Sequence, residues 1–231
     1  MAQNPPDRPQ RSLRVCAVTA TGEASRLAEA RVRSSPQMAG ELQAVVVPLV
    51  ARILGAELVA TPGWLIRPGR VESGSSWETI CRIYYDLTGL TLPETMPPRE
   101  TRRVDAVLDT GDGAPRILEV DEKQHFNPYR ALSLRHYPPG TRVAFPVESW
   151  IEQSEKKTRL EGGRFGIPKP PLFPAEWGRH QQRAFRDALT DLLPLEHGFA
   201  PTLRVGKFEL LPWIYTDEAE ARMRALLDVR L

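Results

Sequence analysis

The segment 117–126 gathers the side chains in this chain that are best suited to binding or catalysis. Its alternating apolar and polar side chains predict a strand in which Leu118 and Val120 point to one face. The opposite face then carries four polar side chains, namely Glu119, Asp121, Lys123 and His125. Carboxylates on one face repel each other unless a cation or a lysine lies between them, so this face is typical of a site that binds charge.

A second strand is predicted just before this segment. Residues 103–108 alternate in the same way, and a glycine-containing turn folds them back as one arm of a hairpin. Pairing across this turn places Asp105 opposite Val120, and a shift of one residue in either direction places it beside Glu119 or Asp121. Three carboxylates and a lysine would then converge on one small patch.

Such a patch has the composition of a divalent-metal site for hydrolysis. Mg²⁺ prefers a few carboxylate oxygens and keeps several waters. The metal would neutralise a phosphate and lower the pKa of a bound water, and a nearby lysine would orient that water. The sequence contains no His-Glu-x-x-His zinc motif, no phosphate-cradling glycine loop and no Gly-x-Ser-x-Gly elbow, so those chemistries are not indicated.

The same residues resemble a known enzyme superfamily. Asp105, followed after fifteen residues by Asp121-Glu122-Lys123, resembles the Asp…(Asp/Glu)-x-Lys motif of the PD-(D/E)XK nucleases. The segment 119–125 is also similar to the Glu-x-Asp-Gly-x-x-His segment of proteins related to very-short-patch-repair endonucleases. The resemblance covers residues 75–160.

This resemblance implies an α/β, restriction-endonuclease-like fold, in which helices flank a mixed sheet and N- and C-terminal elements are added. It implies that Asp105, Glu119 and Asp121 bind Mg²⁺, with Mn²⁺ as a substitute. Lys123 would be the catalytic lysine. Glu78, on the preceding helix, matches the place of a further catalytic glutamate.

Each of these residues also has a purely structural interpretation, and Asp105 alone could be a carboxylate that flanks a turn. Glu119, Asp121 and Lys123 could form a solvated strand face with a cross-strand ion pair. Ser75-x-x-Glu78 is a capping box, in which the glutamate bonds back to the start of its helix.

Basic residues near this segment are candidates for contacts with nucleic acid. His125 could contact a phosphate or a metal-bound water, or could bond a backbone carbonyl. The helix predicted over 176–193 carries arginines at i, i+4 and i+7, which could contact phosphates or form a solvated face. The nucleic-acid-binding candidates are His125, Lys156, Lys157, Arg179, Arg183 and Arg186.

The periodicity of apolar residues and the positions of glycine and proline predict the secondary structure around these residues. Strands are predicted over 13–19, 57–66, 103–108, 117–126, 141–147 and 202–211. Helices are predicted over 23–32, 37–54, 75–87, 129–135, 149–160, 176–193 and 217–231. The predicted organisation is a flexible tail (1–12), an N-terminal lobe (13–70), a nuclease-like core (71–160), a Pro/Gly-rich connector (161–175) and a C-terminal helix–strand–helix unit packing on the core (176–231).

Composition bounds the remaining possibilities. The chain has 231 residues, a net charge of +2 and 41% hydrophobic residues, which fits a globular protein rather than a polycation. No apolar run reaches membrane-span length, the N-terminus has no apolar signal core, and the two cysteines fit a reduced cytoplasmic setting. The charge is divided unevenly along the chain. Residues 99–125 include five basic and seven acidic residues, whereas residues 151–188 include eight basic and five acidic residues.

These features predict a cytoplasmic, metal-dependent nuclease without a membrane partner. Its expected activity is that of a DNA endonuclease of restriction, defence or repair type. A homodimer would allow such an enzyme to cut both strands. The alternatives are a catalytically silent module that binds nucleic acid or supports an assembly, and an α/β interaction protein with a merely solvated strand face.

Overall fold

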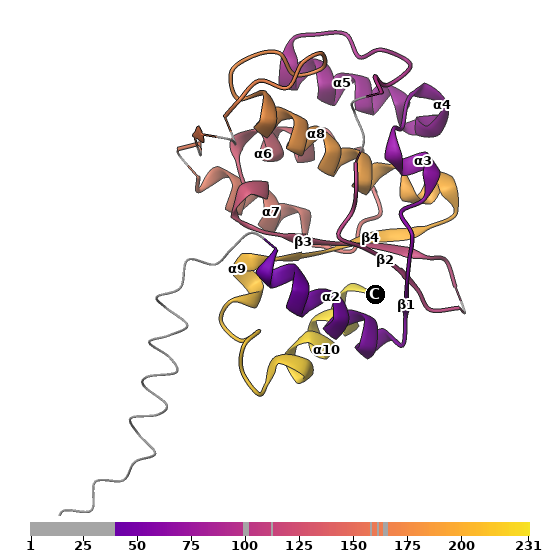
Figure 1. The fold of residues 1–231 in the computed structure, drawn as a ribbon, viewed down its shortest axis with the longest axis vertical. Coiled ribbons are helices and arrows are strands. Elements are labelled where there is room, and N and C mark those ends of the chain that lie inside the picture. The colour runs from indigo at the N-terminus through magenta and orange to yellow at the C-terminus, as the bar shows by residue number, and fades with distance from the viewer. Residues whose placement is uncertain (1–39, 99–101, 112, 158, 161, 164–165) are drawn as a thin grey trace, which may run out of the picture. The chain divides into compact units, whose positions relative to one another are not determined.

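The computed structural model describes residues 40–98, 102–111, 113–157, 159–160, 162–163 and 166–231. The predicted tail 1–12, strand 13–19 and helix 23–32 lie outside these residues. The described part is an α/β fold built on one four-stranded mixed sheet (Figure 1).

The sheet has the strand order β1-β2-β3-β4. Neighbouring strands are antiparallel from β1 to β3, and β4 runs parallel to β3. The strands are β1 (Glu57–Val59), β2 (Ala106–Asp109), β3 (Arg116–Asp121) and β4 (Ala200–Gly206).

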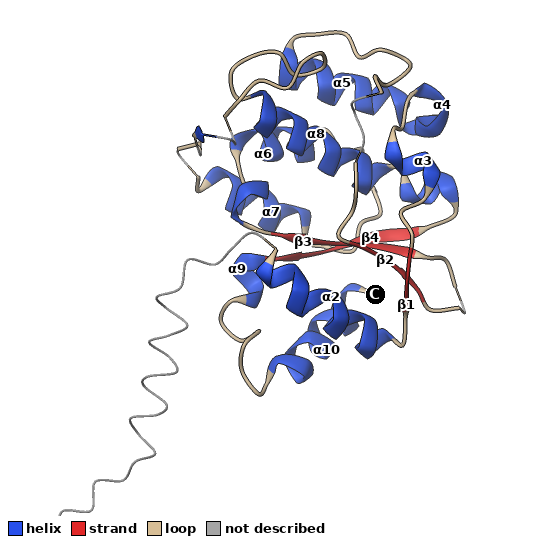
Figure 2. Ribbon diagram, in the orientation of Figure 1, coloured by secondary structure: helices blue, strands red, loops and turns tan. Residues whose placement is uncertain are grey.

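Helices cover both faces of this sheet (Figure 2). One face is covered by α2, α9 and α10, and the other by α6, α7 and α8, with α5 packed on the outer side of α8. The helices are α2 (Glu41–Leu54), α3 (Gly63–Ile66), α4 (Arg70–Ser73), α5 (Trp77–Thr88), α6 (Pro128–Arg135), α7 (Val147–Glu155), α8 (Gly178–Leu192), α9 (Lys207–Leu210) and α10 (Ala219–Arg230). Short 3₁₀ turns are η1 (Gly74–Ser76), η2 (Lys123–His125) and η4 (Pro194–His197).

The alternation predicted along the central strand is confirmed. Leu118 and Val120 are buried in a core shared with α2 and α10. Glu119 and Asp121 are also buried, but they belong to the opposite face of the strand, toward α7 and α8. The polar face is therefore enclosed by helices rather than solvated.

The hairpin register selects one of the predicted pairings. Ala106 pairs with Leu118, so extending the register by one residue places Asp105 opposite Glu119. This is the one-residue shift toward Glu119 rather than the pairing with Val120.

Four predicted strands are shorter than expected. The strand predicted over 103–108 begins at Ala106, and the strand predicted over 202–211 ends at Gly206, where α9 begins. The strand predicted over 57–66 ends at Val59, and the short helix α3 follows Pro62. The strand predicted over 117–126 ends at Asp121, because the chain turns into η2.

The strand predicted over 141–147 is wrong. Its only strand-like contact within the described part is a single parallel bridge from Ala144 to Leu203. Pro146, which lacks an amide N–H, ends the segment, and the place beside β3 is taken by β4.

The helix predictions that fall within the described residues are confirmed in type and in approximate position. α5 ends at Gly89, whose φ of +72° is the left-handed conformation that glycine tolerates. The capping box expected there does not form, because Ser75 Oγ bonds the Glu196 carboxylate and the helix has no side-chain cap. None of the described helices combines the length and apolar character that a membrane span requires.

Candidate active site

A pocket of about 170 Å³ lies between the polar face of the sheet and α8. We call it the arginine pocket. It brings together the six predicted residues Asp105, Glu119, His125, Arg179, Arg183 and Arg186. Its full lining is Arg102, Arg103, Asp105, Glu119, His125, Arg179, Arg183, Arg186 and Asp187.

Asp105 and Glu119 are the two hairpin carboxylates of this pocket. Asp105 Oδ2 accepts a hydrogen bond from the Val120 backbone N–H at 2.8 Å, which fixes the side chain across the hairpin. Glu119 is 6% exposed, and its carboxylate has no hydrogen bond or ion pair with any residue of the described part.

The electrostatic setting of both carboxylates favours an added positive charge. Burial raises the pKa of Asp105, and it raises the pKa of Glu119 well above the usual range. The negative charge of Asp105 raises the pKa of Glu119 further. A cation between the two would relieve this repulsion.

His125 is held by polar contacts on both ring nitrogens. Nδ1 lies 3.0 Å from Asp187 Oδ2 and 3.2 Å from Asp121 Oδ1. Nε2 lies 2.9 Å from Arg183 Nη1. Because a guanidinium only donates, Nε2 must accept, so Nδ1 carries the proton of the neutral ring.

Asp121 lies beneath the arginine pocket rather than in its lining. The side chain is fully buried, and Oδ1 accepts from Arg204 Nη1 at 2.7 Å. Its other oxygen, Oδ2, accepts from Trp150 Nε1 at 2.6 Å. Both oxygens of this predicted metal ligand are therefore engaged by the protein itself.

A buried ionic network extends from this pair. Arg204 Nε lies 2.7 Å from Asp191 Oδ1, and Arg130 Nη2 lies 2.6 Å from Asp191 Oδ2. Burial alone would raise the pKa of Asp187, but His125 and Arg204 outweigh it and hold that pKa well below the usual range. The network forms a charged, hydrogen-bonded floor that positions His125.

Arg102 presents donors that the protein does not satisfy. The side chain is 7% exposed, and its Nη2 donates to Thr190 Oγ1. Nε and Nη1 are buried and have no hydrogen-bond partner among the described residues. Burial lowers the pKa of Arg102 to about 10, so the guanidinium stays charged near neutral pH. Its unsatisfied donors point to an anionic ligand.

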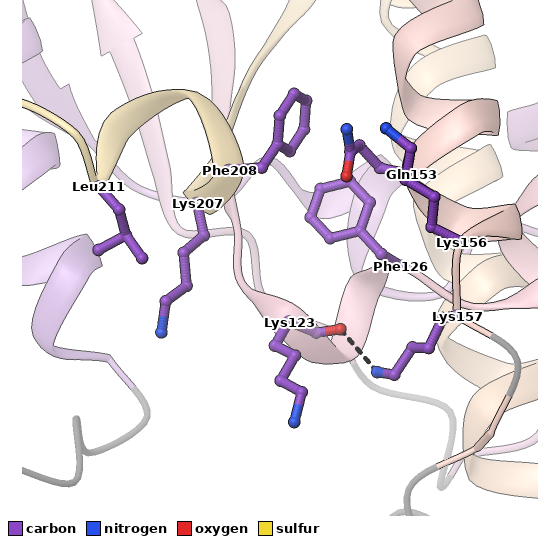
Figure 3. Close-up of a pocket in the computed structure, with 8 residues that line it drawn as sticks. All are labelled: Lys123, Phe126, Gln153, Lys156, Lys157, Lys207, Phe208 and Leu211. Carbon is purple, nitrogen blue, oxygen red and sulfur yellow. Dashed lines mark hydrogen bonds between the residues drawn. The ribbon is translucent and has the colours of Figure 1, made fainter.

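Lys123, Lys156 and Lys157 line a different pocket, which we call the lysine pocket (Figure 3). Lys123 follows the end of β3, in η2, and its carbonyl oxygen accepts from Lys157 Nζ at 2.9 Å. The structure thus does not bring Lys123 together with the hairpin carboxylates. The lining is Lys123, Phe126, Gln153, Lys156, Lys157, Lys207, Phe208 and Leu211.

Glu78 also lies apart from the arginine pocket. It is exposed on α5 and does not belong to the pocket lining. After burial, its charge is the next cause of a raised pKa at the Cys81 thiol, which places it near that residue.

Two carboxylates remain for a metal ion. Within the described residues, no group of three or more His, Cys, Asp or Glu side chains is arranged to hold one. Mg²⁺ is commonly held by one or two carboxylates together with substrate phosphates and water. Asp105 and Glu119 fit that donor set, and Asp121 does not because Arg204 and Trp150 occupy its oxygens.

Several site residues escaped the sequence prediction. Arg102 and Arg103 line the pocket just ahead of Asp105, where their proximity in sequence was a usable signal. Asp187 lies one residue after the arginine series of α8. Arg204 gave no signal, since only the folded chain shows its buried partners.

No family model, curated protein or solved structure matches the chain. The geometry of the arginine pocket therefore carries the functional proposal.

Proposed function

We propose that this protein is a metal-dependent nuclease with a restriction-endonuclease-like fold, which hydrolyses DNA phosphodiester bonds in the arginine pocket. One observation carries the proposal: Asp105 and Glu119 lie across a hairpin in a pocket that five arginines also line. Carboxylates hold cations and arginines hold phosphates, so the pocket combines the two binding functions that such an enzyme needs.

The arginines supply the phosphate-binding part of the proposal. Arg179, Arg183 and Arg186 come from one helix and line the same pocket. The free Nε and Nη1 donors of Arg102 would be satisfied by phosphate oxygens. Contacts of this kind are independent of base sequence and weaken with salt.

Asp105 and Glu119 would hold Mg²⁺ or Mn²⁺. When bound, the ion supplies charge stabilisation at the phosphate and a water of lowered pKa. Glu119 supports this assignment, because it is buried and has no partner within the described part of the chain. The cation would offset the repulsion between the two carboxylates.

His125 would act on the attacking water. Asp187 fixes the Nδ1–H, which leaves Nε2 as the basic nitrogen. Arg183 now donates to Nε2 and also lines the pocket, so a bound phosphate would draw its guanidinium away. Nε2 would then be free to orient the water or accept its proton.

A binding module without catalysis is the second candidate. Lys123 lines the lysine pocket rather than the arginine pocket. Asp121, two residues after Glu119, is engaged by Arg204 and Trp150. A site without a nearby lysine could hold nucleic acid and leave it uncut.

Cleavage of supercoiled plasmid in Mg²⁺ and in Mn²⁺ separates these candidates. Asp105→Asn and Glu119→Gln keep the shape of each side chain and remove its charge. We expect each to lower the cleavage rate by at least about a hundredfold, since a metal ion contributes several kcal/mol to the transition state.

The matched control is Asp109→Asn. Asp109 ends the same strand at its far end, where its Oδ1 accepts from the Gly111 N–H at 2.9 Å. Its rate should stay within about twofold of wild type, as for surface changes away from a site. Binding of DNA without cleavage would favour the silent module, and cleavage that survives both pocket substitutions would refute the assigned site.

A further inference from the structure

The chain has few lysines, and most of them line one pocket. The sequence has 26 arginines and only five lysines. Four of the five, Lys123, Lys156, Lys157 and Lys207, line the lysine pocket (Figure 3). Arginine is the common cation elsewhere, so lysine here indicates a local requirement. Lysine differs from arginine in carrying a compact, strongly hydrated charge on a flexible stem.

The lysine pocket joins segments that are distant in sequence. η2 and the residue after it provide Lys123 and Phe126, α7 and its C-terminal end provide Lys156, and α9 provides Lys207 and Phe208. The cavity has a volume of about 350 Å³, within the range of small-ligand sites. It is an open, concave part of the surface on which these segments meet.

Aromatic rings form the apolar side of this cavity. Phe126 and Phe208 lie edge to face, with ring centroids 5.3 Å apart, and Trp150 packs behind Phe208 at 5.2 Å. In Figure 3 the Lys123 and Lys207 side chains extend the same way beside this aromatic pair. The rings offer a contact surface for an aromatic ligand, and the four lysines line the same cavity.

The charge around the cavity is of one sign. Its described lining has four lysines and no aspartate or glutamate. Like charges gathered at one cavity repel each other and concentrate anions there. A ligand with both a phosphate and an aromatic ring could contact the lysines and the phenylalanines together.

We propose that the lysine pocket binds a terminal nucleotide, with its phosphate held by the lysines and its base against Phe126 and Phe208. The idea that this nucleotide belongs to a nucleic-acid strand rests on the proposed nuclease function. Nucleotide binding itself does not require that function. Lys123 and His125 of the same η2 turn line the two pockets, so a strand bound in one would reach the other.

Binding of short single-stranded DNA tests the proposal directly. The probe is an oligodeoxynucleotide with an internal fluorophore, and its ends carry either phosphate or hydroxyl. Anisotropy is measured with the full chain in EDTA, so that no metal-dependent cleavage occurs. We expect a terminal phosphate to tighten binding by at least about tenfold, the effect of one or more charge-assisted hydrogen bonds.

The Lys156→Ala/Lys207→Ala double variant should abolish this preference for phosphate. The matched control is Lys169→Ala, which removes the fifth lysine, outside the pocket, and should retain the preference. Circular dichroism of both variants checks that the fold is kept. No preference in wild type, or a preference that survives the double variant, would overturn the proposal.

Competition with thymidine monophosphate then identifies the source of the nucleotide. If the free nucleotide displaces the phosphorylated probe, the pocket binds mononucleotides as such. If the free nucleotide does not displace the probe and the preference for a terminal phosphate is still seen, the pocket binds the ends of nucleic-acid strands. The Asp105→Asn variant should show the same preference as wild type. Failure of the nuclease proposal would therefore leave this result standing, and the reverse also holds.

Discussion

The guanidinium of Arg204 pairs with Asp121 and not with Glu119, although Glu119 is its register partner across β3 and β4. Arg204 Nη1 lies 2.7 Å from Asp121 Oδ1, and both side chains are fully buried. This diagonal contact gives Asp121 and Glu119 different electrostatic environments, although both are acidic residues on the same face of β3. Asp121 is neutralised by the protein, whereas Glu119 stays available to a cation.

Arg204→Met should strongly destabilise the fold. Removing the guanidinium leaves Asp121 and Asp191 buried without their shared cation, which costs on the order of 3–5 kcal/mol. Urea unfolding measures this loss. The control is Arg222→Met, which breaks an exposed pair with Glu218 and should cost less than about 1 kcal/mol. Equal losses in the two variants would contradict the structural role of Arg204.

Glu119→Gln should stabilise the fold at neutral and alkaline pH. Because burial raises its pKa, Glu119 keeps its proton to higher pH in the folded state than in the unfolded state. The free energy of unfolding therefore falls as pH rises between these two pKa values. Glutamine does not ionise, so the variant does not lose stability in this way as the pH rises. Its free energy of unfolding should exceed that of wild type by on the order of 1 kcal/mol or more, since one pKa unit corresponds to about 1.4 kcal/mol.

Urea unfolding in metal-free buffer across pH checks this result. The gain should be small near pH 4, at about the unfolded pKa of glutamate, and should level off above the folded pKa. Glu148→Gln, on the exposed side of α7, is the control and should show no such trend. A variant that gains stability and loses cleavage would also show that lost activity does not come from misfolding.

Trp150→Phe should cost about 1–3 kcal/mol of unfolding free energy, because it leaves Asp121 Oδ2 without its donor. Trp64→Phe is the comparison, since Trp64 stacks on His197 at 4.1 Å through its ring. Thermal unfolding of both variants gives the difference. A smaller loss for Trp150→Phe than for Trp64→Phe would show that the indole N–H matters little.

Arg186→Ala should weaken DNA binding and reduce its salt dependence. Loss of one phosphate contact lowers the slope of log K against log salt by about 0.9 for duplex DNA. Titrations at several salt concentrations in EDTA, which removes any metal ion, measure this slope. Arg224→Ala, on α10 and in an exposed ion pair, should leave it unchanged. An unchanged slope for Arg186→Ala would remove this residue from the interface.

Local patterns were predictable from the sequence. The alternation of Leu118 and Val120 with Glu119 identifies the two faces of β3, since only one face meets the apolar core. The helical spacing of Arg183 and Arg186 likewise predicts that they share a surface, and both line the arginine pocket. Their contact with phosphate stays a prediction.

Long-range pairings were not predictable in this way. β4 reads as an ordinary strand, and Arg204 is buried in it only because Asp187 and Asp191 of α8 lie over that face. The strand predicted over 141–147 is wrong for a related reason. Within the described part of the chain, the segment makes a single bridge, from Ala144 to Leu203 of β4, and β4, which comes later in the chain, takes the position beside β3. A local sequence pattern does not show such competition between distant segments.

The η2 turn has a geometric consequence for both proposals. Lys123 and His125 are two residues apart, so their Cα atoms are at most about 7.6 Å apart. One strand of a duplex advances about 3.4 Å per nucleotide. If a strand end is held by the lysines while a bond is cut beside His125, the two contact points lie close together along the strand. The two proposals together then predict short cleavage products.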